Sequence, residues 1–244
     1  MNPTPTVVDR ATWIEARKAL LVREKAHTHE GDAIAAARRR LPMVEVDGSA
    51  TLVGEHGPVS FSDVFDGRDQ LIVYKHMWHS GAGIGGQCEG CTGSLFDVHD
   101  LSYLHHRGVS FAVFADAPYA EIAPYREFMG YPYPWYSMTG VEDPGVAGGL
   151  IDEPGLYHCY LRVGDRVYLT NETIGRGVEA AMVQVRLLDL TVYGRQEAWE
   201  DSPEGWPQFP TGSWWEADGR PVPQWSRPGV EALTTTSADR RHCC

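Results

Sequence analysis

The sequence lacks the features of a membrane protein or a nucleic-acid-binding protein. No apolar run approaches the ~20 residues that span a bilayer, and residues 1–10 have neither the basic start nor the apolar stretch of a secretion signal. Positive charge is scarce, because 21 Lys and Arg residues stand against 33 Asp and Glu residues, for a net charge of −12. An excess of negative charge disfavours binding to phosphates and to anionic membrane surfaces. We therefore expect a cytoplasmic protein with no nucleic-acid and no membrane partner.

Cysteine is also rare, with five residues in a chain of 244. A chain of this length buries a sizeable core without disulfides, and its 43% hydrophobic and 22% charged residues are ordinary for a globular protein. In a reducing compartment, cysteines bind metals or react more often than they form structural disulfides. The glycine-rich residues 81–86 are not followed by Lys and Ser or Thr, which argues against a phosphate-binding loop.

The residue pattern predicts three parts. Residues 1–42 form an N-terminal helical extension, in which the apolar spacing indicates two helices separated at Gly31. Residues 43–192 form an α/β domain. Residues 193–244 form an irregular extension, rich in Trp, Pro and Gly, that ends in a loose tail.

Strand-like and helix-like segments alternate in the α/β domain, which predicts a parallel sheet covered by helices and extended by a late antiparallel hairpin. Asp47-Gly48 favours a tight turn and predicts a hairpin over residues 43–53, followed by a short helix capped by Ser62. We expect strands at 70–78, 109–115 and 134–138, a hairpin over 156–174 that turns at Gly164-Asp165, and helices over 92–108, 118–130 and 176–191.

The C-terminal extension concentrates large aromatic side chains. Five tryptophans lie between Trp199 and Trp225, in a segment with no period of 2 or 3.6 residues. These side chains would be costly to leave in water. We expect the extension to pack against the core or across a two-fold interface, which would make the protein a homodimer.

The motif Cys88-Glu89-Gly90-Cys91 stands where a strand-like segment and a glycine-rich turn lead into a helix. A thiolate at a helix N-terminus faces unpaired backbone N–H groups and the positive end of the helix dipole, which lowers its pKa. The two sulfurs lie one helical turn apart, close enough to form a disulfide. The pair is therefore a candidate redox-active dithiol, and the alternative is that two small apolar side chains simply fill space.

Several ordered motifs carry a family resemblance. They are LIVYKHMW at residues 71–78, the CxxC, RGVSFAVFADAPYAEIAPYREFMGYPYPWYS at 107–137, and IGRGVEAAMVQVRLLDLTVYGRQEAWED at 174–201. Together they resemble the DUF899 family of thioredoxin-like proteins, over roughly residues 43–201. The resemblance implies a thioredoxin-like α/β fold, with the N-terminal helices and the C-terminal extension added to it. By analogy with that fold it favours the dithiol.

The sequence departs from thioredoxins in two places. In thioredoxins a cis-proline just before the late hairpin faces the CxxC, whereas here that position falls near Leu156 or Tyr157 and the nearest proline is Pro154. Roughly a dozen residues separate the strand from the thiols, where a thioredoxin has only a few. His158 and Cys159 lie on the strand that faces the CxxC in thioredoxins, and one of them points toward the site if the strand is regular.

A metal site is the second hypothesis for the same stretch. His76-x-x-His79 precedes Cys88-x-x-Cys91 by eight residues, and two imidazoles with two thiolates suit zinc or copper. The glycine-rich segment between the two pairs would let the chain fold back and bring His79 to the thiols. The absence of the cis-proline removes a block to metal access, as in the copper-binding thioredoxin-like proteins of the Sco type, which this arrangement resembles.

Three further residues are candidates for substrate binding. Trp78 and Trp135 could wall an apolar pocket over the thiols, where a small organic substrate would lie. Arg176, at the start of the last helix, could bind an anionic substrate or form a salt bridge to Glu179.

The sequence is compatible with three functions. The first is a thiol/disulfide oxidoreductase that needs no cofactor and acts on a small-molecule or thiol substrate through Cys88 and Cys91. The second is a copper or zinc protein, a metal-dependent oxidoreductase or oxygenase or a metal carrier, with Cys88, Cys91, His79 and His76 as its ligands. The third is a non-catalytic thioredoxin-like module.

Overall fold

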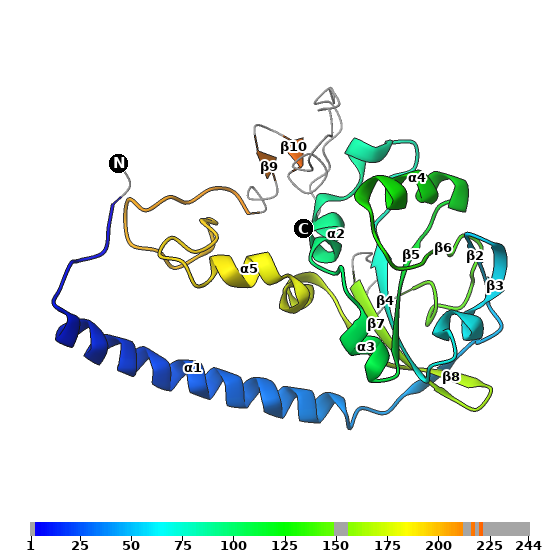
Figure 1. Ribbon diagram of the computed structural model, residues 1–244, viewed down its shortest axis with the longest axis horizontal. Helices are drawn as coiled ribbons and strands as arrows, with labels where there is room; N and C mark the ends of the chain where they lie inside the picture. Colours follow the sequence, from blue (N-terminus) through cyan, green and yellow to red (C-terminus); the bar gives the residue numbers. More distant parts are fainter. Residues whose placement is uncertain (1–2, 149–155, 212–215, 218–219, 222–244) are drawn as a thin grey trace. The chain divides into compact units, whose positions relative to one another are not determined.

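Residues 3–148, 156–211, 216–217 and 220–221 are described by a computed structural model of the chain (Figure 1). The chain divides into two units, of which the first comprises Met1–Pro42 with Asp201–Pro207 and the second Met43–Glu200 with Gln208–Cys244. In the described part of the chain, no helix combines the length and the apolarity that crossing a bilayer requires.

Helix α1 of the first unit runs without interruption from Arg10–Arg38. It begins at Asp9, whose side chain accepts a hydrogen bond of 2.9 Å from the backbone N–H of Thr12. The expected break at Gly31 was wrong: one glycine costs a helix only about 1 kcal/mol relative to alanine, and the alanine-rich residues that follow favour continuation. None of the described side chains of α1 is buried.

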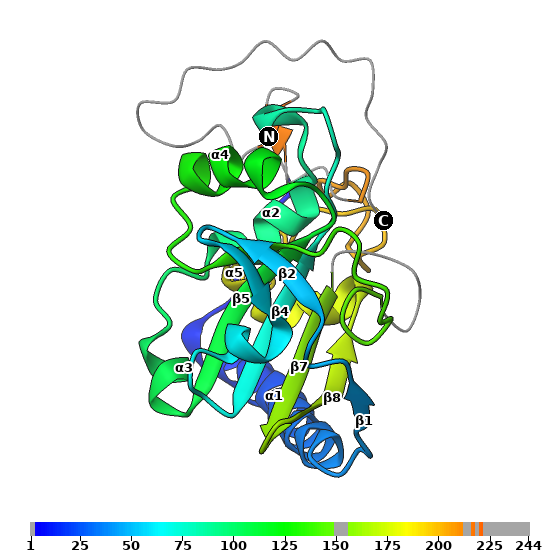
Figure 2. The same ribbon diagram turned by 90° about the vertical axis from the view of Figure 1, so that its right-hand side faces the viewer.

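The second unit is built on a mixed eight-stranded sheet, in which β4, β5, β7 and β8 lie side by side (Figure 2). The strand order is β1-β8-β7-β4-β5-β6-β2-β3. The strands are β1 (Val44–Val46), β2 (Thr51–Gly54), β3 (Gly57–Ser60), β4 (Gln70–His76), β5 (Val109–Ala115), β6 (Trp135–Ser137), β7 (Leu156–Val163) and β8 (Arg166–Thr173).

Short helices connect these strands. They are η1 (Phe61–Phe65), η2 (Ile84–Gly86), α2 (Glu89–Phe96), α3 (Ser102–His106), α4 (Tyr119–Met129), η3 (Gly175–Ala181) and α5 (Val183–Leu188), where η denotes a 3-10 helix. Helix α4 begins after Pro118 and ends at Gly130 in the left-handed conformation, as the sequence predicted. The small strands β9 (Glu216–Ala217) and β10 (Arg220–Pro221) pair antiparallel.

The topology is that of a thioredoxin-like fold. Strand β4 is followed by α2 and α3 and then by β5, which pairs parallel to β4. After α4 the chain crosses to the other edge of β4, where β7 pairs antiparallel to β4, β8 pairs antiparallel to β7, and η3 and α5 follow. The order β8-β7-β4-β5 is the core of this fold, and the predicted fold class is confirmed. Strand β6 and the β2–β3 hairpin extend the β5 side of the sheet.

Four predicted elements were wrong in detail. The strands on either side of Asp47-Gly48 do not form a hairpin, because β1 pairs with β8, and β2 pairs with β3 and β6. The long helix expected after the CxxC is divided into α2 and α3, and Asp100 accepts a 2.8 Å hydrogen bond from the backbone N–H of Ser102 at the second start. The last helix is likewise divided into η3 and α5 at Met182, and the short helix η1 is capped by Ser60 rather than Ser62.

The C-terminal extension is only partly described. Residues 193–211 form turns with one isolated bridge between Glu197 and Phe209. Trp214, Trp215 and Trp225 lie outside the described residues, as does Pro154 near the expected cis-proline position. The expected packing of the extension across a two-fold interface stays a prediction.

Two hydrophobic clusters fill the second unit. One includes Val46, Phe61, Phe114 and Tyr160 and packs against one face of the sheet. The other contains both cysteines of the CxxC together with side chains of β4, β5, α4, β6, β7 and η3: Tyr74, Phe111, Tyr125, Trp135, Tyr157 and Val178. The candidate site is therefore built into the core of the fold.

Candidate functional site

The two cysteines lie where the carboxyl end of β4 meets the amino end of α2. Cys88 is the N-terminal cap of α2, and its sulfur accepts a hydrogen bond of 3.4 Å from the backbone N–H of Cys91. The backbone N–H of Met77, directly after β4, donates to the sulfur of Cys91 at 3.3 Å. Both cysteines are only 3% exposed. The predicted arrangement of the CxxC at a helix start is present, and the sulfurs are more deeply buried than a surface dithiol would be.

Thr92 fastens the first turn of α2 to the neighbouring helix. Its backbone N–H and its hydroxyl both donate to the carbonyl of Cys88, at 3.0 and 2.7 Å. The same hydroxyl shares a short hydrogen bond with the hydroxyl of Tyr125 on α4. Burial raises the pKa of Tyr125 well above 10, so its hydroxyl keeps its proton. These contacts fix the backbone that carries both sulfurs.

Two tyrosines of the sheet, Tyr74 and Tyr157, belong to the hydrophobic cluster that includes side chains of α2. Neither was predicted from the sequence. Tyr74 on β4 and Tyr157 on β7 are direct register partners, and their rings meet edge to face with centroids 4.8 Å apart. Burial raises the pKa of Tyr74 well above 10, and the negative charge of a Cys91 thiolate raises it further. Because side chains alternate along a strand, Tyr74 lies on the same face of β4 as His76. This alternation is the sequence signal by which Tyr74 could have been predicted to lie near the candidate site.

His76 lies inside an aromatic cluster rather than at an open ligand position. It is 1% exposed, and its ring centroid lies 5.3, 5.6 and 5.8 Å from those of Trp135, Tyr125 and Trp78. Burial lowers the pKa of His76 to about 3, so the imidazole is neutral at physiological pH. Neither ring nitrogen has a hydrogen-bond partner among the described residues.

His79 is held by its own glycine-rich loop. Its Nδ1 pairs with the carbonyl of Gly86 at 2.9 Å, and its backbone N–H donates to Oε1 of Gln87 at 3.0 Å. The loop does fold back, as expected, but these contacts satisfy His79 locally. Across the described residues, no three His, Cys, Asp or Glu side chains are grouped closely enough to hold a metal ion. The geometry therefore does not support the predicted ligand set of Cys88, Cys91, His79 and His76.

The two tryptophans expected to wall a substrate pocket have different surroundings. Trp135 is 1% exposed and stacks on Tyr131 with ring centroids 5.5 Å apart, so it belongs to the core. Trp78 is half-buried, and its Nε1 donates to Glu121 at 3.0 Å. The same carboxylate accepts the backbone N–H of Gly81 at 2.8 Å, which ties the glycine-rich loop to α4. Trp78 is thus the tryptophan at the border between the thiol cluster and solvent.

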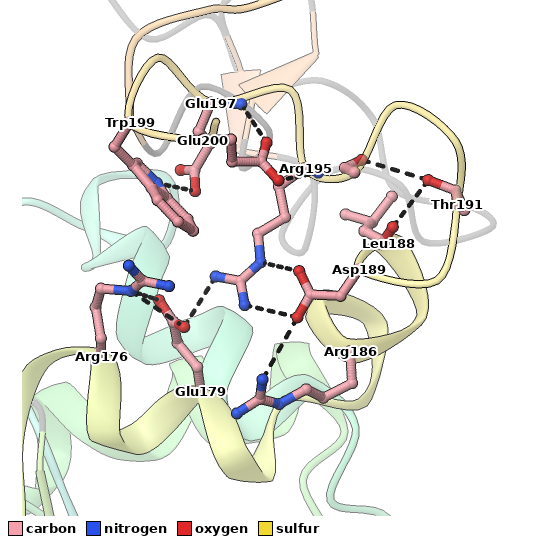
Figure 3. Close-up of polar contacts among 11 residues, drawn as sticks. Arg176, Glu179, Arg186, Leu188, Asp189, Thr191, Arg195, Glu197, Trp199 and Glu200 are labelled. Carbon is pink, nitrogen blue, oxygen red and sulfur yellow. Dashed lines mark hydrogen bonds and ion pairs between the residues drawn. The ribbon is translucent and has the colours of Figure 1, made fainter. Parts of the chain in front are cut away.

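Arg176 forms the salt bridge that the sequence left open. Its Nε lies 3.2 Å from Glu179, and its guanidinium lies 3.8 Å from the centre of the Trp199 ring (Figure 3). A second arginine, Arg195, was missed. It is 5% exposed and contacts Asp189 through two hydrogen bonds of 2.6 and 2.9 Å and Glu179 through one of 2.8 Å. These ion pairs fasten residues 194–200 to η3 and α5.

The side chain of His158 lies on the face of the sheet opposite to the thiols. Its Nδ1 pairs with the hydroxyl of Tyr160 at 2.8 Å, and its Nε2 lies 3.1 Å from Glu172. Burial lowers the pKa of His158 to about 3, and the charge of Lys75 lowers it further. Cys159 is half-buried, and its carbonyl accepts a hydrogen bond from Thr170. The structure therefore gives His158 no place beside Cys88 or Cys91.

Comparison with known proteins gives a family and a set of solved structures. No curated protein matches the sequence significantly. The solved structures that match include the bacterioferritin comigratory protein of Xanthomonas campestris, at 8% identity and a TM-score of 0.37 over 58% of this chain and 92% of that chain. Peroxidoxin BcpB of Mycobacterium tuberculosis matches at 16% identity and a TM-score of 0.33, over 60% of this chain and 94% of that one.

The family assignment covers most of the sequence. Residues 2–219 match the family described as "Bacterial protein of unknown function (DUF899)". The match is longer at both ends than the roughly 43–201 that the sequence motifs indicated, and includes helix α1 and the start of the C-terminal extension. The chain belongs to the DUF899 family.

Proposed function

We propose that this protein is a thiol/disulfide oxidoreductase whose reactive pair is Cys88 and Cys91. The observation that carries the proposal is the position of the pair: Cys88 caps α2 with a backbone N–H directed at its sulfur, and the N–H of Met77 is directed at the sulfur of Cys91. Two N–H groups aimed at sulfur atoms stabilise thiolates, which are the reactive form in disulfide exchange. A pair that only filled space would not require such donors.

The exchange conserves atoms and electrons. When the pair is a disulfide, a substrate thiolate attacks one sulfur, a mixed disulfide forms, and the other cysteine leaves as a thiolate with the electron pair of the broken S–S bond. A second substrate thiolate then attacks the substrate sulfur of the mixed disulfide, the protein cysteine leaves as a thiolate with the electron pair of that S–S bond, and a substrate disulfide is released. Two electrons and two protons have passed to the protein, and the pair is a dithiol.

The burial of the sulfurs bears on the substrate class. Each cysteine is 3% exposed and lies in a cluster of aromatic side chains. A small uncharged thiol or disulfide suits such a site better than a charged one, because burying an unpaired charge is costly. We propose that Trp78, at the solvent border of the cluster, contacts such a substrate, whereas Arg176 already binds Glu179.

The test is an equilibrium titration of the full chain in mixtures of reduced and oxidised glutathione. The tryptic peptide of residues 76–107 contains both cysteines, and its mass after acid quenching and alkylation reports their oxidation state. We expect reversible loss of two hydrogens at a defined glutathione ratio. Cys88→Ser and Cys91→Ser should each abolish this transition, and Cys159→Ser, the matched control, should leave it unchanged. A pair that stays reduced in every mixture would favour the non-catalytic module.

A further inference from the structure

Two buried side chains next to the thiols carry nitrogen atoms without a hydrogen-bond partner. In the described part of the chain, neither Nδ1 nor Nε2 of His76 has such a partner, and the same holds for Nε1 of Trp135. Both side chains are 1% exposed, and their ring centroids lie 5.3 Å apart. Buried polar atoms are almost always hydrogen-bonded in folded proteins, because an unpaired one is costly. Three such atoms on two adjacent rings indicate a site for a polar group that does not belong to the chain.

This pair of rings lies beside the CxxC. The backbone N–H of Met77, the residue after His76, donates to the Cys91 sulfur at 3.3 Å. Covalent geometry therefore keeps Cβ of His76 within about 7 Å of that sulfur. Trp135 belongs to the hydrophobic cluster that contains both sulfurs, and the half-buried ring of Trp78 lies 5.8 Å from that of His76. A small molecule that contacts Trp78 is therefore within reach of both the imidazole and the sulfurs.

The donors and acceptors of the two rings match a neutral hydroxyl group. An indole N–H only donates, whereas a neutral imidazole donates through one nitrogen and accepts through the other. Burial lowers the pKa of His76 to about 3, so the imidazole stays neutral and cannot balance the charge of a carboxylate. A hydroxyl accepts from Nε1 of Trp135 while it donates to the unprotonated nitrogen of His76, and it brings no charge into the cluster.

From this arrangement we infer that His76 and Trp135 bind the hydroxyl group of a small neutral thiol whose sulfur exchanges with Cys88 and Cys91. The assignment rests on the proposed function and names its substrate class, a short hydroxythiol or its disulfide. His76 and Trp135 contribute to binding alone. In the exchange itself, the substrate thiolate forms a bond to one protein sulfur, and the S–S bond breaks with its electron pair passing to the other.

Two thiols of equal size, mercaptoethanol and propanethiol, test the inference because only the first has a hydroxyl. The full chain is treated with chelator and oxidised with glutathione disulfide, and the rate of reduction by each thiol is measured. Dividing the ratio of the two rates by the same ratio for free glutathione disulfide cancels the difference in thiol reactivity. We expect the protein to favour mercaptoethanol by about three- to tenfold, the effect of one net hydrogen bond.

His76→Phe should remove this preference, because it keeps an aromatic ring and deletes both nitrogens. The matched control is Tyr157→Phe, which removes a buried hydroxyl of the same cluster that already donates to the carbonyl of Ser94 at 3.1 Å. This control should keep the preference of the wild type. The free energy of unfolding of His76→Phe should stay close to that of the wild type, because no described residue loses a hydrogen bond. Loss of the preference at unchanged stability separates a binding role from a structural one.

A second measurement covers the case in which His76→Phe does not fold. The probe is (methylthio)ethanol, which has the hydroxyl but no thiol, added to wild-type protein with nitrogen-15 labelled histidines. His76 and His158 both stay neutral at pH 5, and the signals lost in His158→Gln assign the two. We expect the probe to shift the ring nitrogen signals of His76, and methyl propyl sulfide, which lacks the hydroxyl, to leave them in place.

Equal preferences in the wild type and His76→Phe, or no shift of the His76 signals, would overturn the inference. So would copper or zinc that the untreated wild type retains and His76→Phe loses, because a metal ion would then be the partner of these nitrogens. If the cysteine pair exchanges with neither thiol while (methylthio)ethanol still shifts the His76 signals, the proposed function fails and the hydroxyl site stands.

Discussion

Replacing Arg195 by methionine should destabilise the second unit strongly, because the substitution keeps the aliphatic bulk and removes the charge from a buried ion-pair network (Figure 3). Breaking a buried pair by removing one partner costs about 3–5 kcal/mol. The side chains of Glu179 and Asp189 keep 19% and 32% exposure, so water compensates part of that loss. We therefore expect a decrease of about 2–4 kcal/mol in the free energy of unfolding, and of about 5–15 °C in Tm.

Arg186→Met is the matched control for this experiment. Arg186 also contacts Asp189, at 3.4 Å, but its side chain is 53% exposed, and exposed pairs contribute about 0–1 kcal/mol. Arg195 lowers the pKa of Asp189, so the contribution of this pair is present above the ordinary carboxyl pKa and is lost as the pH falls through the lowered value. Urea denaturation at pH 7 and at pH 3 measures both effects. An Arg195→Met protein within about 0.5 kcal/mol of Arg186→Met at pH 7 would refute the reasoning.

Two further predictions concern Lys75 and His79. Burial lowers the pKa of Lys75 from 10.5 to about 7. Between these two pH values the unfolded chain binds one proton more than the folded chain. The free energy of unfolding should therefore rise by about 1 kcal/mol per pH unit from pH 7 to 10. Denaturation at several pH values should show this slope in the wild type and a flatter one in Lys75→Met; equal slopes would count against it. His79→Ala should leave glutathione exchange within about two- to threefold if the dithiol acts alone. Metal analysis of the untagged wild type and of His79→Ala checks the alternative. If His79→Ala lost copper or zinc and activity together, by about tenfold or more, the result would favour a metal site.

The elements that sequence reasoning predicted well are those whose signals are local. Strands β4 and β5 are apolar runs of strand length, β7 and β8 join at Gly164-Asp165, and Pro118 and Gly130 bound α4. The strand pairing around Asp47-Gly48 failed because it depends on distant partners. Val46 of β1 pairs with Val167 of β8, and Val53 of β2 pairs with Ser137 of β6. A turn dipeptide indicates that the chain reverses direction. It does not determine with which strands the two flanking segments pair.

The same distinction between local and distant signals applies to the site. Cys88 and Cys91 could be selected as candidates from the sequence because the CxxC is contiguous, and its position at a helix start can be predicted from neighbouring residues. Tyr74 was missed because the cluster that it shares with Cys91 joins residues of a strand and a helix across a long loop. Arg195 was missed for a related reason: its partners Asp189 and Glu179 belong to the preceding elements, and nothing in an irregular segment marks one arginine as buried.

The ion pairs of Arg195 connect to the thiols through η3. Glu179, which binds both Arg176 and Arg195, follows Val178, and Val178 lies in the hydrophobic cluster that holds Cys88 and Cys91. Met182, at the end of η3, accepts a hydrogen bond of 3.7 Å from Ser94 on α2. A 3-10 helix has poorer hydrogen-bond geometry than an α-helix, so its position depends more on side-chain contacts. Element η3 thus contacts that cluster through Val178 and is joined to residues 194–200 through the ion pair of Glu179 with Arg195.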